Sequence, residues 1–156
     1  MTNIEIERKY LVVDDSYKAL AVSHYSIVQG YICRESGRTV RVRMRTSSDG
    51  TTNAYLTIKG KAQEGTLSRY EWEREIDMND AKELLHLCQG TIISKTRWLV
   101  PAQEDGLVWE IDEFAGHKTG LTIAEIELTH EEQTYTLPSY IGAEVTGQKQ
   151  YYNSNM

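Results

Sequence analysis

The sequence predicts a mainly β fold of the α+β class, in which eight antiparallel strands close into a β-barrel with a few short flanking helices. Three observations support this class. Eight segments alternate apolar and polar side chains with the two-residue period of a strand. Turn signals such as Asp49-Gly50 and Asp105-Gly106 join neighbouring segments into hairpins. No repeat, low-complexity tract or linker divides the chain, so residues 1–156 are expected to form a single domain.

The first predicted strand covers residues 4–11 and carries an unusual row of charges. Because side chains alternate across a strand, Glu5, Glu7 and Lys9 share one face and the apolar residues share the other. A similar division into a charged face and an apolar face returns in most later strands. These strands are predicted over residues 25–33, 39–45, 54–60, 67–78, 92–100, 107–114 and 121–129.

Three short helices are predicted between or after the strands. Residues 14–16 are aspartate and serine, which cap helix N-termini well, and they are expected to begin a helix over residues 17–22. Asn79 is expected to cap a second helix, which Gly90 ends. Pro138 is expected to open a last short helix before a polar tail.

The charged faces of the strands hold bases and acids together. The bases are Lys9, Arg41, Arg43, Arg45, Lys59, Arg69, Lys95 and Arg97. The acids are Glu5, Glu7, Glu71, Glu73, Glu75, Glu110, Asp112, Glu125 and Glu127. Either the apolar faces fill the barrel and the charged faces meet water, or the charged faces line the lumen. Periodicity alone favours the first arrangement, because a solvated row of charges is common on small barrels.

Bulk composition excludes several classes of partner. A net charge of −6 and a pI near 5.2 argue against binding to a nucleic-acid polymer or to an anionic membrane. No apolar run approaches the ~20 residues that span a bilayer, and the N-terminus lacks the layout of a signal peptide. Cys33 and Cys88 lie far apart and outside any C-x-x-C pattern, so we expect free thiols in a cytoplasmic protein.

A lumen lined by these charges would point to metal and phosphate chemistry. Eight bases and nine acids leave that face at −1, and two divalent cations would bring it to +3. A triphosphate of roughly four negative charges would then nearly neutralise the site. Carboxylates without His or Cys ligands favour the hard cations Mg²⁺ or Mn²⁺. Arginine suits the phosphates, because its planar fork binds phosphate oxygens in pairs.

An ordered set of motifs runs along nearly the whole chain. It begins with an E-x-E-x-K pattern, Glu5-Ile6-Glu7-Arg8-Lys9, followed by Tyr10-Leu11-Val12. It continues with Arg41-Val42-Arg43, Leu56-Thr57-Ile58-Lys59-Gly60, Arg69-Tyr70-Glu71-Trp72-Glu73 and Lys95-Thr96-Arg97. It ends with Trp109-Glu110-Ile111-Asp112, Ala124-Glu125-Ile126-Glu127-Leu128 and Glu144-Val145-Thr146-Gly147. This set resembles the CYTH superfamily, the triphosphate tunnel metalloenzymes, and most of all its short bacterial branch.

The resemblance implies a tunnel with the charges inside and assigns a role to most of them. Metal ligands would be Glu5, Glu7, Glu125 and Glu127, with Glu71 and Glu73 as ligands of a second ion. The phosphates would be bound by Lys9, Arg41, Arg43, Lys59, Arg69, Lys95 and Arg97. The residues expected to act in catalysis are Lys9, Lys95, Arg97 and Asp112, with Lys95 or a carboxylate removing a proton from water.

The resemblance leaves the outer positions and the tail less defined. Arg45, Glu75 and Glu110 are expected either at the rim of the tunnel or in surface salt bridges. The family's tail packs at one tunnel mouth, and here residues 147–151 carry no acidic residue near Lys149, where one is expected.

The implied activity is metal-dependent hydrolysis of a small-molecule triphosphate, either tripolyphosphate or a nucleotide. With Mg²⁺ or Mn²⁺ as cofactor, inorganic tripolyphosphatase is the expected function. Alternatives are an adenylate cyclase that converts ATP to cyclic AMP, hydrolysis of another nucleoside triphosphate or thiamine triphosphate, and non-catalytic polyphosphate binding. A purely structural barrel with a solvated charged face is the remaining alternative. An apolar outer wall is compatible with a homodimer.

Overall fold

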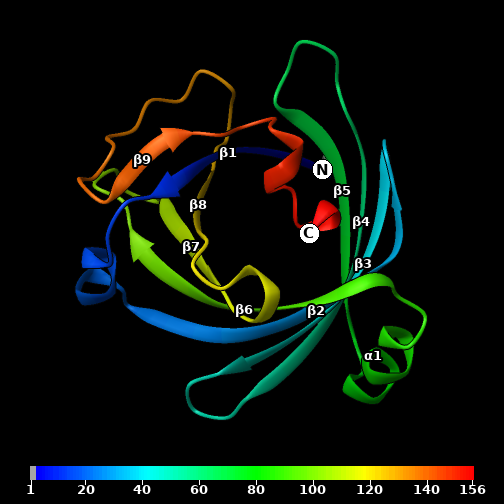
Figure 1. The fold of residues 1–156 in the computed structure, drawn as a ribbon. Coiled ribbons are helices and arrows are strands. Elements are labelled where there is room, and N and C mark those ends of the chain that lie inside the picture. Colours follow the sequence, from blue (N-terminus) through cyan, green and yellow to red (C-terminus); the bar gives the residue numbers. More distant parts are fainter. Residues whose placement is uncertain (1–2) are drawn as a thin grey trace.

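The computed structural model describes residues 3–156 and confirms a closed, eight-stranded antiparallel barrel, with a ninth strand added to it (Figure 1). The barrel strands are β1 (Ile4–Val12), β2 (Ser23–Glu35), β3 (Arg38–Ser47), β4 (Thr52–Ala62), β5 (Ser68–Ile76), β6 (Gln89–Pro101), β7 (Val108–Phe114) and β8 (Thr122–Glu127). The extra strand is β9 (Ile141–Glu144). No helix within residues 3–156 has the length and apolar character needed to cross a membrane.

Closure of the barrel depends on β1. The strands are paired in the order β5-β4-β3-β2-β6-β7-β8-β1, and β1 returns to pair with β5. On one edge β1 pairs with β8, where Glu7 lies opposite Glu127 and Lys9 opposite Glu125. On its other edge Glu5 lies opposite Arg69 of β5. β1 therefore places the acidic row of the opening motif between the two halves of the chain.

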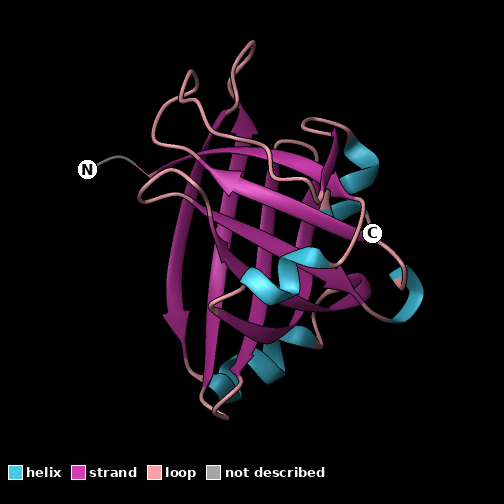
Figure 2. Ribbon diagram, turned by 90° about the vertical axis from the view of Figure 1, so that its left-hand side faces the viewer, coloured by secondary structure: helices cyan, strands magenta, loops and turns pink. Residues whose placement is uncertain are grey.

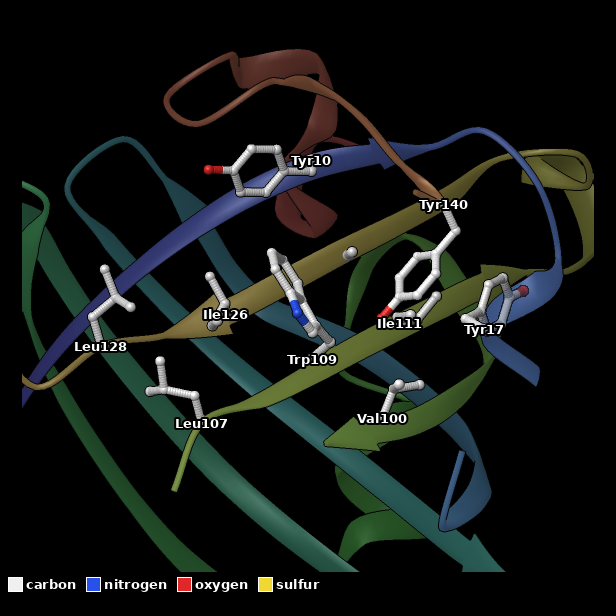
Figure 3. Packing of buried hydrophobic residues seen from close by; sticks show 10 residues of the cluster. Tyr10, Tyr17, Val100, Leu107, Trp109, Ile111, Ile126, Leu128 and Tyr140 are labelled. Carbon is white, nitrogen blue, oxygen red and sulfur yellow. The ribbon is translucent and has the colours of Figure 1, made fainter. Parts of the chain in front are cut away.

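The main hydrophobic core lies outside the ring of strands. Trp109 of β7 is fully buried, and its ring packs edge-on against Tyr10 of β1 with 5.6 Å between the ring centroids. Figure 3 shows Tyr17 and Tyr140 on the same side of the sheet, beside Ile111. These side chains come from the apolar faces of β1, β7 and β8 and from the segments that cover them. Because this core covers the outer wall, the opposite faces of the same strands are directed into the lumen.

The one α-helix found within residues 3–156 covers another part of the wall. Helix α1 (Met78–Leu85) buries Ala81 against Val42 of β3 and Ala54 of β4. It lies outside the ring in Figure 1, next to β3 and β4. The remaining helical pieces are 3₁₀ turns over Ser16–Leu20, Gly116–Lys118, Lys149–Tyr151 and Asn153–Asn155.

The predicted helix boundaries need several corrections. The segment predicted to be helical over residues 17–22 is a 3₁₀ turn over Ser16–Leu20. Helix α1 is capped by Asp77, whose Oδ1 accepts a hydrogen bond from the Asn79 backbone N–H at 2.8 Å, so the predicted cap at Asn79 is wrong. The helix also ends at Leu85, before Gly90, which has a φ of +70° and belongs to β6.

The helix predicted after Pro138 is also wrong, since residues 139–140 form a turn and β9 begins at Ile141. The backbone of β1 has an open edge beyond the residues that pair with β5. Residues 141–145 fill that edge, and the Val145 backbone N–H donates to the Lys9 carbonyl at 2.8 Å. An unpaired backbone edge next to a core is costly, and this cost outweighs the local helix signal of the proline.

Candidate active site

The lumen of the barrel contains a cavity of about 270 Å³ that is lined by side chains from all eight barrel strands. Its eight basic side chains are Lys9, Arg41, Arg43, Arg45, Lys59, Arg69, Lys95 and Arg97. Its seven acidic side chains are Glu5, Glu7, Glu71, Glu73, Glu110, Glu125 and Glu127. The charged faces therefore point inward, contrary to what the periodicity alone favoured. Of the residues that the sequence assigned to the site, only Asp112 does not line the cavity.

Asp112 lies directly behind the lining, where it neutralises two bases. Arg97 donates from Nε and Nη2 to the two carboxylate oxygens of Asp112 at 2.7 and 2.9 Å. Lys95 Nζ lies 2.7 Å from Asp112 Oδ2. Burial alone would raise the pKa of Asp112, but the charges of Arg97 and Lys95 lower it to about 2. All three residues are buried, so this group is a fixed part of the wall.

The positive charge of Lys95 has fewer acidic partners in this group than that of Arg97. Arg97 occupies both Asp112 oxygens, and it also donates from Nη1 to Glu110 at 3.1 Å. Burial lowers the pKa of Lys95 to about 7, and the nearby cations Arg97 and Arg43 contribute to this shift. The negative charge of Asp112 opposes this shift but does not cancel it. Lys95 is thus a lysine that can exchange a proton near neutral pH.

A second cluster of charges lies where β1 meets β4 and β5. Lys59 Nζ donates to both carboxylate oxygens of Glu5 at 2.9 Å and lies 3.3 Å from Glu71. Arg69 Nε donates to Glu5 at 3.4 Å. Burial opposes the charged form of Glu5, but the Lys59 charge lowers its pKa to about 2. Burial raises the pKa of Glu71 to about 7, with Glu5 acting in the same direction.

The third cluster is acidic and lies across the β1–β8 pair. Burial raises the pKa of Glu7 well above its usual value, and the charges of Glu125 and Glu5 add to the effect. The Lys9 Nζ ammonium lies 3.6 Å from Glu125 Oε1 and partly neutralises the charge of that carboxylate. Within residues 3–156, neither Glu7 nor Glu127 takes part in an ion pair. Negative charge is therefore in local excess here.

This acidic cluster fits a divalent cation by the chemistry of its donors. In the side-chain positions described for residues 3–156, no three His, Cys, Asp or Glu side chains come together as a ready metal site. Lys9 and Lys59 instead take up part of the carboxylate oxygens. Burial raises the pKa of the Glu7 carboxyl, the charges of Glu125 and Glu5 add to this rise, and a bound cation would relieve that repulsion between carboxylates. An all-carboxylate set of this kind suits Mg²⁺ or Mn²⁺.

The opposite wall carries a row of arginines on β3. Arg41 donates to Thr57 Oγ1 at 3.1 Å and lies 3.5 Å from Glu73. Arg43 donates from Nε to Gln29 at 2.8 Å. Burial lowers the pKa of Arg43 to about 9, and the neighbouring charges of Arg41 and Arg97 add to the effect. The electrostatic strain that this shift reports would be relieved by an anion in the cavity.

The C-terminal segment closes one end of the lumen. Tyr152, Asn153 and Ser154 line the cavity, and Asn153 Oδ1 accepts hydrogen bonds from Lys95 Nζ at 2.9 Å and Gln29 Nε2 at 3.0 Å. Beyond Asn153 lies an apolar floor, which we define as Tyr31, Ile93, Phe114, Ile123 and Met156. The segment lies within the ring of strands in Figure 1 and at one end of the barrel in Figure 2.

Sequence reasoning missed several residues that line the cavity. Tyr25, Tyr31 and Gln29 of β2 lie on or beside it, and this strand has no charged row to reveal its inner face. Thr57 shares the face of Lys59, so alternation alone could have identified it. Three positions were expected either at the tunnel rim or in surface salt bridges, and of these Arg45 and Glu110 line the cavity. Glu75 is exposed and accepts a hydrogen bond from Asn53.

The chain is similar to known proteins over nearly its whole length. The family model of the CYTH domain matches residues 3–154. An inorganic triphosphatase of Acetivibrio thermocellus is 42% identical over 153 residues, which cover 97% of this chain and 92% of the relative. An inorganic triphosphatase of Nitrosomonas europaea is 33% identical over 151 residues, covering 96% and 93%. The crystal structure of the inorganic triphosphatase NE1496 superimposes with a TM-score of 0.63 at 30% identity, covering 97% of this chain and 92% of that one.

We predict that the Asp112→Ala substitution lowers the free energy of unfolding by about 3–5 kcal/mol, because it leaves Lys95 buried without its counter-ion and Arg97 paired with Glu110 alone. Urea denaturation provides the measurement. Glu144→Ala is the matched control, because Glu144 pairs with Arg8 at 2.9 Å on the surface and should contribute less than about 1 kcal/mol. Equal losses in the two variants would show that the Asp112 group does not stabilise the wall.

Proposed function

Because the chain belongs to the CYTH domain family, we propose that it is an enzyme that hydrolyses triphosphates with the help of divalent cations, and that inorganic tripolyphosphate is its substrate. The observation that carries this proposal is the mixed lining of the cavity, with eight bases and seven acids facing each other inside a closed barrel. Bases alone would suit a simple anion receptor, and carboxylates alone a cation site. Both together fit a complex of a metal with a polyphosphate.

We propose that the basic residues hold the phosphates along the lumen. Arg41 and Arg43 line one wall, and Lys95 and Arg97 line another. Their donors are oriented before substrate arrives, since Thr57, Gln29 and Asp112 fix three of these side chains by hydrogen bonds. Lys9, Lys59 and Arg69 add positive charge where the phosphate chain meets the acidic cluster. Preorganised donors of this kind stabilise charge on the transferring phosphoryl group.

Glu5, Glu7, Glu125 and Glu127 are proposed to hold the divalent cation, with Glu71 and Glu73 near a second one. When bound, such ions supply positive charge to the phosphate oxygens and lower the pKa of a water molecule. Lys9 and Lys59 pair with Glu125 and Glu5 in the described structure. Because they are flexible ammonium groups, they can turn toward phosphate oxygens and release carboxylate oxygens for the cation.

Lys95 is proposed to accept the proton of the attacking water. The water oxygen bonds to the terminal phosphorus, the bridging P–O bond breaks, and pyrophosphate leaves beside the new orthophosphate. A base with a pKa of about 7 is present in both forms near neutral pH, which is the condition for efficient proton transfer. As an ammonium ion the same side chain contributes to phosphate binding.

The alternatives differ in product or in turnover. An adenylate cyclase would form cyclic AMP from ATP, and a non-catalytic binding module would retain phosphate affinity without turnover. The metal-ligand candidates line the same cavity as the bases, which supports an enzyme.

Two free cysteines support our proposal of a cytoplasmic location. A single functional unit over residues 1–156 and a homodimer stay predictions.

A panel of tripolyphosphate, ATP, thiamine triphosphate and pyrophosphate, each with Mg²⁺, Mn²⁺ or a chelator, tests the proposed activity. We expect release of orthophosphate and pyrophosphate from tripolyphosphate with the highest kcat/KM, and loss of activity with the chelator. Cyclic AMP as the main product from ATP would favour the cyclase instead. Phosphate binding with no turnover on any substrate would favour a binding module.

The pH dependence of tripolyphosphate hydrolysis tests the role of Lys95. We expect kcat/KM to rise as the pH rises through about 7, because burial lowers the pKa of Lys95 to that value and only the neutral amine accepts a proton. Lys95→Arg keeps the positive charge but removes the base, so it should lose this limb of the profile and lower kcat by about 100-fold or more. An unchanged limb in Lys95→Arg would assign the base to another group.

A further inference from the structure

The arginine row of β3 has a third member, Arg45, to which the proposed function gives no separate role. Arg41, Arg43 and Arg45 alternate along β3, and all three line the cavity. The guanidinium carbon of Arg45 lies 4.9 Å from the ring centroid of Tyr25 and 5.2 Å from that of Tyr55. Its Nη2 also donates to the Tyr55 hydroxyl at 3.0 Å and to Asn53 Oδ1 at 3.5 Å. Two aromatic rings and two hydrogen bonds therefore hold the guanidinium in place at the cavity wall.

Arg45 retains donor capacity that the protein does not use. Its Nε is buried and has no hydrogen-bond partner within the described part of the chain. No carboxylate of residues 3–156 pairs with its guanidinium. A buried cationic donor without a partner is unfavourable, and an anion bound against it would remove that cost. The position of Arg45 on the cavity wall makes a bound phosphate the natural acceptor.

The inner face of β2 shows that a longer phosphate chain would meet different side chains on the two sides of Gln29. Along the inner face of β2, Tyr25 lies against Arg45, Gln29 bonds to Asn153, and Tyr31 packs in the apolar floor. Tyr25 and Tyr31 are six residues apart, which spans about 20 Å of strand. Arg45 and the floor thus lie on opposite sides of Gln29. A phosphate chain that extends past Gln29 toward the floor meets apolar side chains, and one that extends toward Tyr25 meets Arg45.

We propose that Arg45 is a specificity-determining residue that binds the fourth phosphate of tetrapolyphosphate and the corresponding phosphate of longer chains. The inference rests on the proposed function of the same cavity, and it extends that function from tripolyphosphate to the chain length that the site accepts. The guanidinium fork binds phosphate oxygens in pairs, and Tyr25 and Tyr55 hold it in position for them. Tripolyphosphate, bound over Arg41, Arg43, Lys95 and Arg97, depends less on Arg45.

Steady-state kinetics on tripolyphosphate and tetrapolyphosphate tests this assignment with native protein, Arg45→Gln and Arg74→Gln. Arg74 is the matched control, because its guanidinium also stacks on an aromatic ring, 4.8 Å from the Trp72 centroid, but is exposed. We expect Arg45→Gln to reduce the ratio of kcat/KM for tetrapolyphosphate over tripolyphosphate by about tenfold. Arg74→Gln should leave the ratio unchanged, and Arg45→Lys should give an intermediate ratio because it keeps a point charge.

Each other outcome separates this inference from the proposed function. If native protein cleaves tripolyphosphate but Arg45→Gln leaves the ratio unchanged, Arg45 is not a subsite and the proposed function stands. An equal loss on both substrates would make Arg45 a structural residue. Selective loss of ATP hydrolysis would place a nucleoside there instead. If native protein cleaves neither substrate, the proposed function fails, and calorimetric binding of tetrapolyphosphate to native protein and Arg45→Gln still decides the role of Arg45.

Discussion

Mutual neutralisation of charges inside a closed barrel is the constraint on which the rest of the structure depends. Fifteen charged side chains line one cavity, and removing so many charges from water is affordable only when each has partners. Arg97 and Lys95 meet Asp112, and Lys59 and Arg69 meet Glu5. The pairing is incomplete in two places, the acidic cluster around Glu7 and the arginine row of β3. These are the two places where a cation and a phosphate chain would complete it.

The outer wall follows from the same constraint. With charges inside, the apolar faces of the strands need a cover of their own, and the chain supplies it in pieces. The loop after β8 and the first 3₁₀ turn bring Tyr135, Tyr140 and Tyr17 over Trp109, while α1 covers β3 and β4. Figure 3 shows the side chains of Tyr10 and Trp109, which come from the strands, on the same side of the sheet as that of Tyr140, which comes from the cover. The helices and loops thus stabilise the barrel from outside and leave its lumen to the ligand.

Strand alternation predicted most of the architecture but not the side on which its core lies. All eight barrel strands were predicted, because each shows a two-residue period bounded by turn residues. Alternation cannot show which face is inside, and only the resemblance of motifs such as Glu5-Ile6-Glu7-Arg8-Lys9 indicated a charged lumen. β9 and the tail residue Asn153 were missed because long-range contacts place them. β9 pairs with the open edge of β1, and Asn153 binds Lys95 and Gln29 at the end of the lumen. Local sequence carries no signal for such contacts.

The central claim is that metal and triphosphate meet inside the lumen, between the acidic cluster and the arginine row. Anomalous diffraction from crystals grown with Mn²⁺ and an imido analogue of tripolyphosphate, in which nitrogen replaces the bridging oxygens, tests it most directly. The account predicts a manganese peak within coordination distance of Glu7, Glu125 or Glu127, and phosphorus density along Arg41 and Arg43. Manganese and analogue bound on the exterior, with the lumen free of both, would contradict it.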